Sequence, residues 1–395
     1  MTLLRLFVLL ILVLGPTTAW GQRPPAPRGM SPRMIRLVRQ IEPDRQGRVD
    51  RLPQYVEFFR AQLANDTRLF AFDVQAKQVD GRVQLTGYVE FPETRFGVEE
   101  FLYTLGFADV DNQLQVLPAD DLGERIFGLV KATHTISFAT PGGREAVTDC
   151  LLGEPLYLLR QEGDWLLAHS AEGYLGYVAA ADVLRVDEDQ FNRYQLTPHV
   201  RLVADHKTDG GQTLPVGAAL PTVDGGGDGG LRCLLPGGEE VDVPADKCDR
   251  IQSHHDAIEQ VVAAGRELLG TPYLWGGKTT AGVDCSGLVQ VSFAAVGASL
   301  SRDANQQFFT GKLAGTRWHR SGLRRGDTLY FIGSWGRIRH TALYLGNGRF
   351  LHAEEPVVTI ASLNPDDEDY DAGRAASFAF AKRLWDWAPA DQPAP

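Results

Sequence analysis

The chain has 395 residues, of which 44% are hydrophobic and 23% are charged, as in ordinary globular proteins. This length predicts two to four domains. The formal net charge of −11 argues against nucleic acid or an anionic membrane surface as the main partner, because both recognise a basic face.

The first residues have the pattern of an export signal. Arg5 precedes an apolar run at 6–14, and Ala19-Trp20-Gly21 is a small-x-small cleavage site. Segment 1–21 is therefore predicted to be a signal peptide, which directs the protein to the periplasm or outside the cell. The alternative is an uncleaved or buried N-terminal segment. Because the run is too short to span a bilayer, we expect no integral membrane span in the mature chain.

A linker and a small domain are predicted next. Residues 22–50 are rich in proline and arginine and are interpreted as a linker. Segment 51–118 has the apolar spacing of a small α+β domain and resembles the BON-like domains of exported bacterial proteins. Its helices and strands are expected at 52–63, 72–74, 83–89, 94–106 and 113–117.

Two all-β segments follow, at 119–190 and 191–252. Short apolar strands alternate with turn residues in both, and the glycine tract 225–230 is expected to be a loop. The first segment resembles bacterial SH3-like domains, which are small barrels of cell-wall proteins, and the second reads as a degenerate copy. That resemblance rests on the runs Gly153-Glu154, Gly163-Asp164-Trp165 and Gly173-Tyr174-Leu175-Gly176-Tyr177-Val178.

Four cysteines occur in the chain. Cys233 and Cys248 are close enough in sequence to pair across a short loop if the protein is exported. Cys150 and Cys285 would then stay unpaired, and a free thiol in an exported protein requires an explanation.

The segment 253–395 has a mixed α/β pattern, and Cys285 lies in its most informative part. Asp284 is a good N-cap residue, and apolar and small residues follow at helical spacing, so Cys285 is expected in the first turn of a helix. A helix N-terminus and a nearby imidazolium lower the pKa of a thiol, and the thiolate is the nucleophilic form. The alternative is a small buried cysteine that packs as a hydrophobe.

Two histidines belong to a predicted hairpin: His340 opens the strand 341–345, and His352 lies on the strand 349–353. With a two-residue loop between the strands, 343 pairs with 352, and His340 and His352 face opposite sides; with a three-residue loop, 342 pairs with 352 and both share a face. Gly348 can adopt the left-handed conformation that the longer loop needs, so we predict that loop. His340 is then the candidate base for Cys285, and His352 is the group that orients it.

These residues together resemble a known family. Asp284-Cys285-Ser286-Gly287, a histidine that opens a strand and a second on the next strand are similar to the NlpC/p60 cysteine peptidases. Tyr273-x-Trp275-Gly276-Gly277 and Arg325-Gly326-Asp327 fit the same pattern. The resemblance covers about residues 255–385. It implies a papain-like fold, hydrolysis of peptide bonds in peptidoglycan, and neither a metal nor an organic cofactor.

With SH3-like segments ahead of it, the chain is similar to one branch, the γ-D-glutamyl-L-diamino acid endopeptidases. This resemblance implies cleavage of the γ-D-Glu–diamino acid bond in muropeptides that carry a free N-terminal L-Ala. The implied substrate-side residues are Asp284, Ser286, Tyr174 with Tyr177 as its alternative, Glu145, Arg302, and Tyr273 beside the backbone N–H of Cys285 at the oxyanion position. Ala304 stands where the family often has a serine, so no hydroxyl acts there.

Two other functions stay open on the sequence. One is a wall-binding adaptor with an inert core, which the intact Cys-His-His set disfavours. The other is a cysteine amidase or acyltransferase on the same core, which product identification would distinguish.

Overall fold

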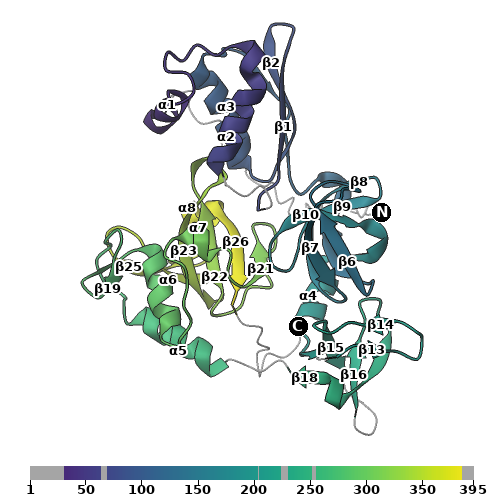
Figure 1. Cartoon of the computed structure of the whole chain (residues 1–395). Helices are drawn as coiled ribbons and strands as arrows, with labels where there is room; N and C mark the ends of the chain where they lie inside the picture. Colours follow the sequence, from purple (N-terminus) through teal and green to yellow (C-terminus); the bar gives the residue numbers. More distant parts are fainter. Residues whose placement is uncertain (1–30, 64–68, 203, 224–229, 251–254, 385–395) are drawn as a thin grey trace, which may run out of the picture.

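The computed structural model describes residues 31–63, 69–202, 204–223, 230–250 and 255–384 (Figure 1). The predicted signal peptide at 1–21 lies outside these residues. Four units follow one another along the chain: an α+β unit, two β units and a mixed α/β unit. Within the described ranges, no helix has both the length and the apolar character needed to cross a membrane.

The N-terminal unit has the predicted order of elements. Its helices α2 and α3 pack on a sheet in which β1 and β2 form an antiparallel hairpin and β3 and β4 run parallel to β2. The elements are α2 (Leu52–Leu63), β1 (Phe72–Val79), β2 (Arg82–Val89), α3 (Pro92–Leu105), β3 (Val110–Asn112) and β4 (Gln115–Val116).

The linker prediction for 22–50 is wrong for its described part. Helix α1 (Pro32–Val38) is capped by Ser31 and places Met34 and Val38, both 0% exposed, in the core of the N-terminal unit. The apolar residues 34, 37 and 38 have the spacing of a helix face. The proline and arginine content masked this short periodicity.

The first β unit is one seven-stranded antiparallel sheet with the strand order β11-β5-β8-β9-β10-β6-β7. Within the described residues, β11 and β7 remain the two edges, and no backbone ladder closes the sheet. Its strands are β5 (Phe127–Val130), β6 (His134–Phe138), β7 (Ala146–Leu151), β8 (Pro155–Glu162), β9 (Trp165–His169), β10 (Leu175–Ala179) and β11 (Val183–Val186).

Helix α4 (Glu188–Leu196) leads into the second β unit. This unit has a five-stranded antiparallel sheet, with the order β17-β16-β15-β12-β18, and a separate hairpin of β13 and β14. Its strands are β12 (His199–Leu202), β13 (His206–Lys207), β14 (Thr213–Leu214), β15 (Ala219–Val223), β16 (Gly230–Leu234), β17 (Glu240–Pro244) and β18 (Cys248–Arg250). Cys233 and Cys248 do not form a disulfide, and Cys150 and Cys285 are also thiols.

The C-terminal unit is built on a six-stranded antiparallel sheet with the order β21-β26-β22-β23-β24-β25. Leu343 and Leu351 on one face pack with α5 and α6, while Ala342 and Phe350 on the other face pack with residues around α8. The strands are β21 (Lys312–Thr316), β22 (Thr328–Ile332), β23 (Ile338–Gly346), β24 (Arg349–Ala353), β25 (Val358–Ser362) and β26 (Phe378–Arg383), with a small hairpin of β19 (Lys278–Thr279) and β20 (Gly282–Val283). The helices are α5 (His255–Arg266), α6 (Cys285–Ala294), α7 (Ala304–Gln307) and α8 (Ala372–Ser377).

The N-terminal unit is docked on the C-terminal unit through Trp335. This residue lies in the β22–β23 connection, is 4% exposed and belongs to the core of the N-terminal unit. Its ring centroid is 6.3 Å from that of Phe59, and the guanidinium of Arg33 lies 4.7 Å from it. Arg317 adds a two-pronged ion pair to Glu93 at 2.9 and 3.1 Å.

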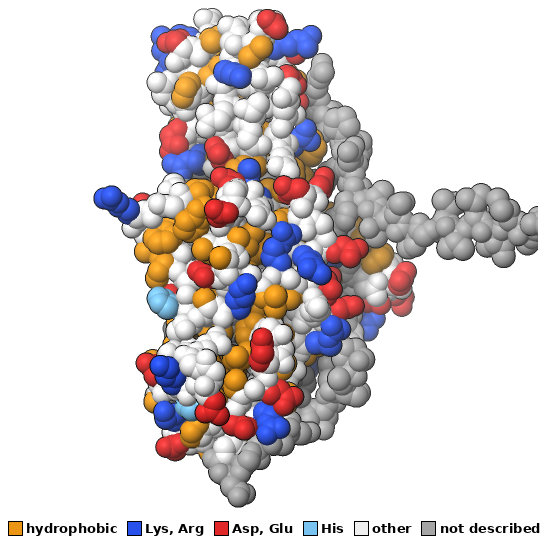
Figure 2. All heavy atoms as spheres, turned by 90° about the vertical axis from the view of Figure 1, so that its right-hand side faces the viewer, with side chains coloured by type: hydrophobic (Ala, Val, Ile, Leu, Met, Phe, Trp, Pro, Cys, Tyr) orange, Lys and Arg blue, Asp and Glu red, His pale blue; other side chains and the backbone are white. Residues whose placement is uncertain are grey.

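Charged side chains of both signs are interspersed over the face shown in Figure 2, with apolar side chains between them. No large area of a single charge sign dominates this view of the described residues.

Candidate active site

Helix α6 begins at Cys285, as predicted. Asp284 has the extended backbone of an N-cap residue, and its side chain accepts a hydrogen bond of 2.7 Å from the N–H of Gly287. Cys285 is 7% exposed, and its sulfur accepts hydrogen bonds from the backbone N–H groups of Thr341 and Ser286. The bond to Thr341 places the thiol against β23, beside the residue that follows His340.

The β23–β24 hairpin brings the two histidines together by a route that differs from the predicted one. Leu343 pairs with Leu351, so position 342 stands opposite His352, which is the predicted register. The loop is nevertheless the short one, because Gly346 pairs directly with Arg349. A bulge between Tyr344 and Gly346 supplies the extra residue and restores the register.

His340 and His352 form a hydrogen-bonded pair. Nε2 of His340 lies 3.1 Å from Nδ1 of His352, and the two rings are almost perpendicular at 89°. The residues are 6% and 2% exposed, respectively. One of the two nitrogens must donate and the other accept, so this contact couples the tautomers of the two rings.

Burial sets the protonation of these groups. It is the largest effect raising the pKa of Cys285, to which Asp284 also contributes, whereas the amides of Thr341 and Ser286 oppose the rise. The pKa of His340 is held well below its ordinary value of 6.5 by burial, by Arg374 and by His352. The pKa of His352 falls to about 4, through burial and then Arg374. The expected lowering of the thiol pKa is therefore wrong, because desolvation outweighs the helix N-terminus.

Asp284 is the centre of a polar network at the N-terminus of α6. Nη1 and Nη2 of Arg302 donate to its two carboxylate oxygens at 3.0 and 2.5 Å, and Nη1 also donates to Oγ of Ser286 at 2.9 Å. The backbone N–H of Gly276 binds the same carboxylate at 2.7 Å. Burial acts to raise the pKa of Asp284, but these bonds, led by Arg302, hold it below its ordinary value.

Tyr273 lies close to Asp284 and Cys285. It forms an isolated bridge with Val283, and its N–H donates to the carbonyl of Pro356 at 2.9 Å. Burial raises the pKa of Tyr273, and the nearby Cys285 is the next contribution. The upstream motif and the nucleophile are thus brought together, as the sequence predicts.

The substrate-side residues of the first β unit are placed differently from one another. Tyr174 lies on the β9–β10 turn and lines a cavity of about 340 Å³ with Phe308 and Phe309, just after α7. Tyr177 is buried on β10, where its hydroxyl lies 2.9 Å from that of Tyr88 of the N-terminal unit.

Glu145 is exposed in the β6–β7 turn. Among the described residues, its carboxylate has no hydrogen bond or ion pair to the groups around Cys285. Its predicted role in binding the substrate amine stays a prediction.

Two residues near the histidines were missed by the sequence reasoning. Arg374 of α8 pairs with Glu354 and lowers the pKa of both histidines. Glu354 itself lies 3.6 Å from Nδ1 of His352. Glu354 follows the end of β24, two residues after His352, but nothing in the sequence places Arg374 beside them.

A third missed residue, Gln307, supports the first turn of the helix that carries the nucleophile. Its side-chain amide donates to the carbonyl of Ser286 at 3.0 Å. No motif marked this glutamine, because its partner is a backbone group.

One group of side chains has the spacing of a metal site. The ligand atoms of His352, Glu354 and Asp371 lie within 4.8 Å of one another. Glu354, however, is bound to Arg374, and Asp371 caps α8 by accepting from the N–H of Arg374 at 2.9 Å. These carboxylates already serve α8, and the absence of a metal stays a prediction.

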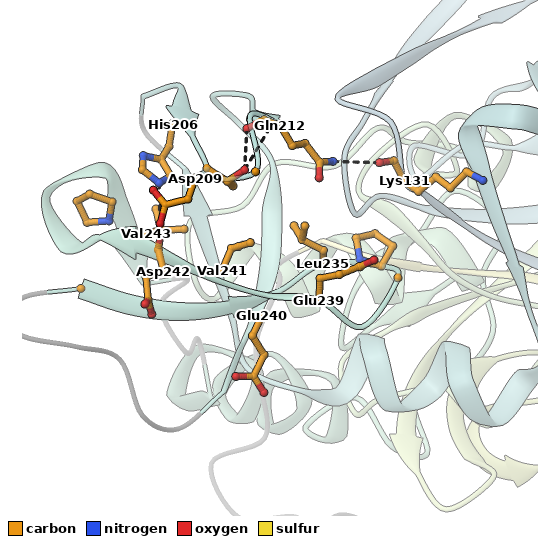
Figure 3. Close-up of a pocket in the computed structure, with 16 residues that line it drawn as sticks. Lys131, His206, Asp209, Gln212, Leu235, Glu239, Glu240, Val241, Asp242 and Val243 are labelled. Atoms are coloured by element: carbon orange, nitrogen blue, oxygen red, sulfur yellow. Dashed lines mark hydrogen bonds between the residues drawn. The ribbon is translucent and has the colours of Figure 1, made fainter.

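A large cavity of about 940 Å³ lies in the second β unit, away from the groups above (Figure 3). It is open between the β13–β14 hairpin and strands β16 and β17, and a hydrogen bond of 3.2 Å from Gln212 to the carbonyl of Lys131 crosses one end. None of the candidate catalytic residues lines it, so its size does not mark the reaction site.

A buried thiol at the start of a helix, beside hydrogen-bonded histidines on an antiparallel sheet, is the arrangement of a papain-like cysteine peptidase. Comparison with known sequences agrees: the NlpC/P60 family model matches residues 270–370. "Dipeptidyl-peptidase 6" of Lysinibacillus sphaericus is 30% identical over 228 residues, which cover 53% of this chain and 80% of that protein. The chain belongs to the NlpC/P60 family.

Two further comparisons cover a similar share of the chain. A "Gamma-D-glutamyl-L-lysine dipeptidyl-peptidase" of Bacillus cereus is 27% identical over 239 residues, covering 55% of this chain and 70% of that protein. The crystal structure of an NlpC/P60 family protein from Bacillus cereus aligns at 20% identity with a TM-score of 0.29, covering 66% of this chain and 100% of the other.

Proposed function

We propose that the protein is a cysteine peptidase that hydrolyses the γ-D-Glu–diamino acid bond of peptidoglycan stem peptides with a free N-terminal L-Ala. The observation that carries the proposal is the match to a γ-D-glutamyl-L-lysine dipeptidyl-peptidase over 70% of its length, together with the Cys285, His340 and His352 cluster.

Catalysis starts from a neutral pair. As Cys285 attacks the carbonyl carbon of the γ-D-Glu unit, its proton passes to His340, which acts as a general base. Nε2 of His340 is occupied by His352, so Nδ1 is the nitrogen left to accept the proton of the thiol. His352 holds that ring and its tautomer, in the way the third member of a catalytic triad does.

The oxyanion of the tetrahedral intermediate is stabilised at the start of α6. The N–H of Cys285 is among the first four of the helix, which have no acceptor within it. Tyr273 lies close enough to assist. The intermediate collapses as His340 gives its proton to the leaving amine, and a water activated by His340 then cleaves the thioester and restores the thiol.

Recognition of the peptide N-terminus involves Asp284, Ser286, Arg302 and Tyr174. Because Arg302 already occupies both oxygens of Asp284, this carboxylate fixes Arg302 and Ser286 at the cleft and acts on the ammonium of the substrate only at longer range. Tyr174 closes the cleft from the side of the first β unit. Glu145, which is exposed on the β6–β7 turn, is the acid assigned to the amine of the substrate.

The remaining assignments belong to the same proposal. The two β units are divergent SH3-like domains, and the protein is exported and meets muropeptides in the periplasm or outside the cell. The strand content of the β units and the signal pattern at 1–21 support these assignments.

The test is cleavage of L-Ala-γ-D-Glu-L-Lys and its diaminopimelate analogue, followed by mass spectrometry, with Cys285→Ala as the matched variant. We expect the wild type to release L-Ala-D-Glu and Cys285→Ala to release none; an N-acetylated peptide should be a poor substrate. Equal turnover by the variant would refute the proposal. Cleavage of a different wall bond would indicate an amidase, and wall binding without turnover would indicate an adaptor.

A further inference from the structure

The turn 170–174 after β9, which carries Tyr174, is held at every one of its middle peptide groups. The carbonyl oxygens of residues 171, 172 and 173 each accept a hydrogen bond. The donors are, in that order, the backbone N–H of Leu313 at 2.7 Å, Nζ of Lys382 at 2.5 Å and Nδ1 of His169 at 3.0 Å. Two of these donors belong to the C-terminal unit, so the turn is fixed relative to the sheet that carries the histidines.

His169 in turn is held by the N-terminal unit. Its Nε2 lies 2.9 Å from Oε1 of Glu90, the residue that follows β2. Oε2 of Glu90 accepts from the N–H of Ala71 at 2.9 Å. Glu90 is 2% exposed and His169 is 0% exposed, so water does not compete for these bonds.

The hydrogen bonds of His169 connect the turn to the N-terminal unit. The carbonyl of Gly173 can only accept, so Nδ1 of His169 carries a hydrogen and donates it. The other ring nitrogen, Nε2, faces Oε1 of Glu90 at 2.9 Å. The imidazole therefore bridges the turn and the residue that follows β2.

The turn is linked to the helix of the nucleophile through the end of α7. Tyr174 lines a cavity with Phe308 and Phe309, and Gln307, the residue before Phe308, binds the carbonyl of Ser286 next to the nucleophile. A shift of the turn would therefore move the wall of this cavity while leaving the bond between His340 and His352 unchanged.

We propose that Glu90 and His169 are positioning residues of the peptidase: through their buried hydrogen bonds they fix the turn 170–174 and let the N-terminal unit set the affinity for the peptide substrate. This inference rests on the proposed function and on the role given there to Tyr174. Neither residue touches the reacting atoms, so the effect falls on KM and leaves kcat close to its normal value.

Two other charged groups face the turn: Glu172 on the turn itself and Lys382 on β26. Burial lowers the pKa of Lys382 to about 8, so KM values are compared at about pH 7, where the ammonium of Lys382 still donates to the carbonyl of Glu172.

Glu90→Gln is the matched control. The glutamine oxygen can accept from Ala71, and its NH2 group can donate to Nε2 of His169, so every hydrogen bond survives. Its KM should match that of the wild type, whereas His169→Phe, which cannot bind Gly173, should have a KM about tenfold higher with little change in kcat.

Amide hydrogen exchange of the full chain supplies a readout that needs no substrate. Peptides covering 170–174 and the N–H of Leu313 should lose protection in His169→Phe but not in Glu90→Gln. A folded His169→Phe variant whose KM and exchange both match the wild type would overturn the inference. If the wild type cleaves no peptide, the proposed function fails, and the exchange data alone still decide whether the pair holds the turn.

Discussion

The burial of the two histidines predicts that the acid limb of the pH–rate profile lies at an unusually low pH. An imidazole with the ordinary pKa of 6.5 would be about 3% neutral at pH 5, so a general base of that kind would lose about thirtyfold in rate. With its pKa near 4, His352 is still about 90% neutral at pH 5, and His340 is lowered well below 6.5. We therefore expect kcat/KM to change less than about twofold between about pH 7.5 and about pH 5.

Arg374 provides the perturbation that tests the cause. Arg374→Gln removes the positive charge that lowers both histidine pKa values, so the acid limb should move toward neutral pH; Arg374→Lys keeps the charge and should move it less. The assay is kcat/KM for L-Ala-γ-D-Glu-L-Lys from about pH 4.5 to about pH 9, with circular dichroism at each pH to confirm folding. A wild-type limb centred near 6.5, with a thirtyfold loss at pH 5, would refute the reasoning.

Three further predictions concern the thiol, the ion pair and stability. Because burial raises the pKa of Cys285, alkylation by iodoacetamide should accelerate only at alkaline pH; a plateau of fast alkylation extending to about pH 5 would instead show a thiolate–imidazolium pair. Arg302→Met removes three charge-assisted hydrogen bonds and should lower kcat/KM about tenfold to a hundredfold, and adding Asp284→Asn should cost little more; additive losses would show that Asp284 acts independently of Arg302. Burial lowers the pKa of His319 to about 4, so the folded state binds fewer protons than the unfolded state below 6.5, and stability that is full above 6.5 is lost as the pH falls, by roughly 2 kcal/mol at pH 5. The melting temperature of His319→Gln should therefore fall less on acidification than that of the wild type; an equal fall would contradict this assignment.

Local rules predicted the position of the nucleophile. Asp284 is a strong N-cap residue followed by helical spacing, so the start of α6 could be placed to the residue. The alternation of β23 and β24 likewise limited the histidines to two registers. The register was predicted correctly, but from a three-residue loop that the hairpin does not have. The bulge between Tyr344 and Gly346 gives the same register with a two-residue loop, and preferences for loop length do not anticipate a bulge.

Features that depend on packing between distant segments could not be predicted. Arg374 meets the histidines only because α8 folds over one face of the sheet, and its own segment has no motif. The direction of the Cys285 pKa depends on how deeply the thiol is buried, which the sequence does not specify. Glu145 was assigned by analogy with a position in other proteins, and its side chain on the exposed β6–β7 turn has no local motif that would fix its role.

Trp335 has a practical consequence for anyone who shortens this protein. A chain that started after residue 118 would keep the indole on its β22–β23 connection but lose the pocket around Phe59 and Gly97 that encloses it. The exposed indole would then form an apolar patch near the catalytic sheet, and the shortened protein would be prone to self-association. Exchange of the N-terminal unit between related enzymes should therefore include the β22–β23 connection, because the indole on this connection fills a pocket in the N-terminal unit.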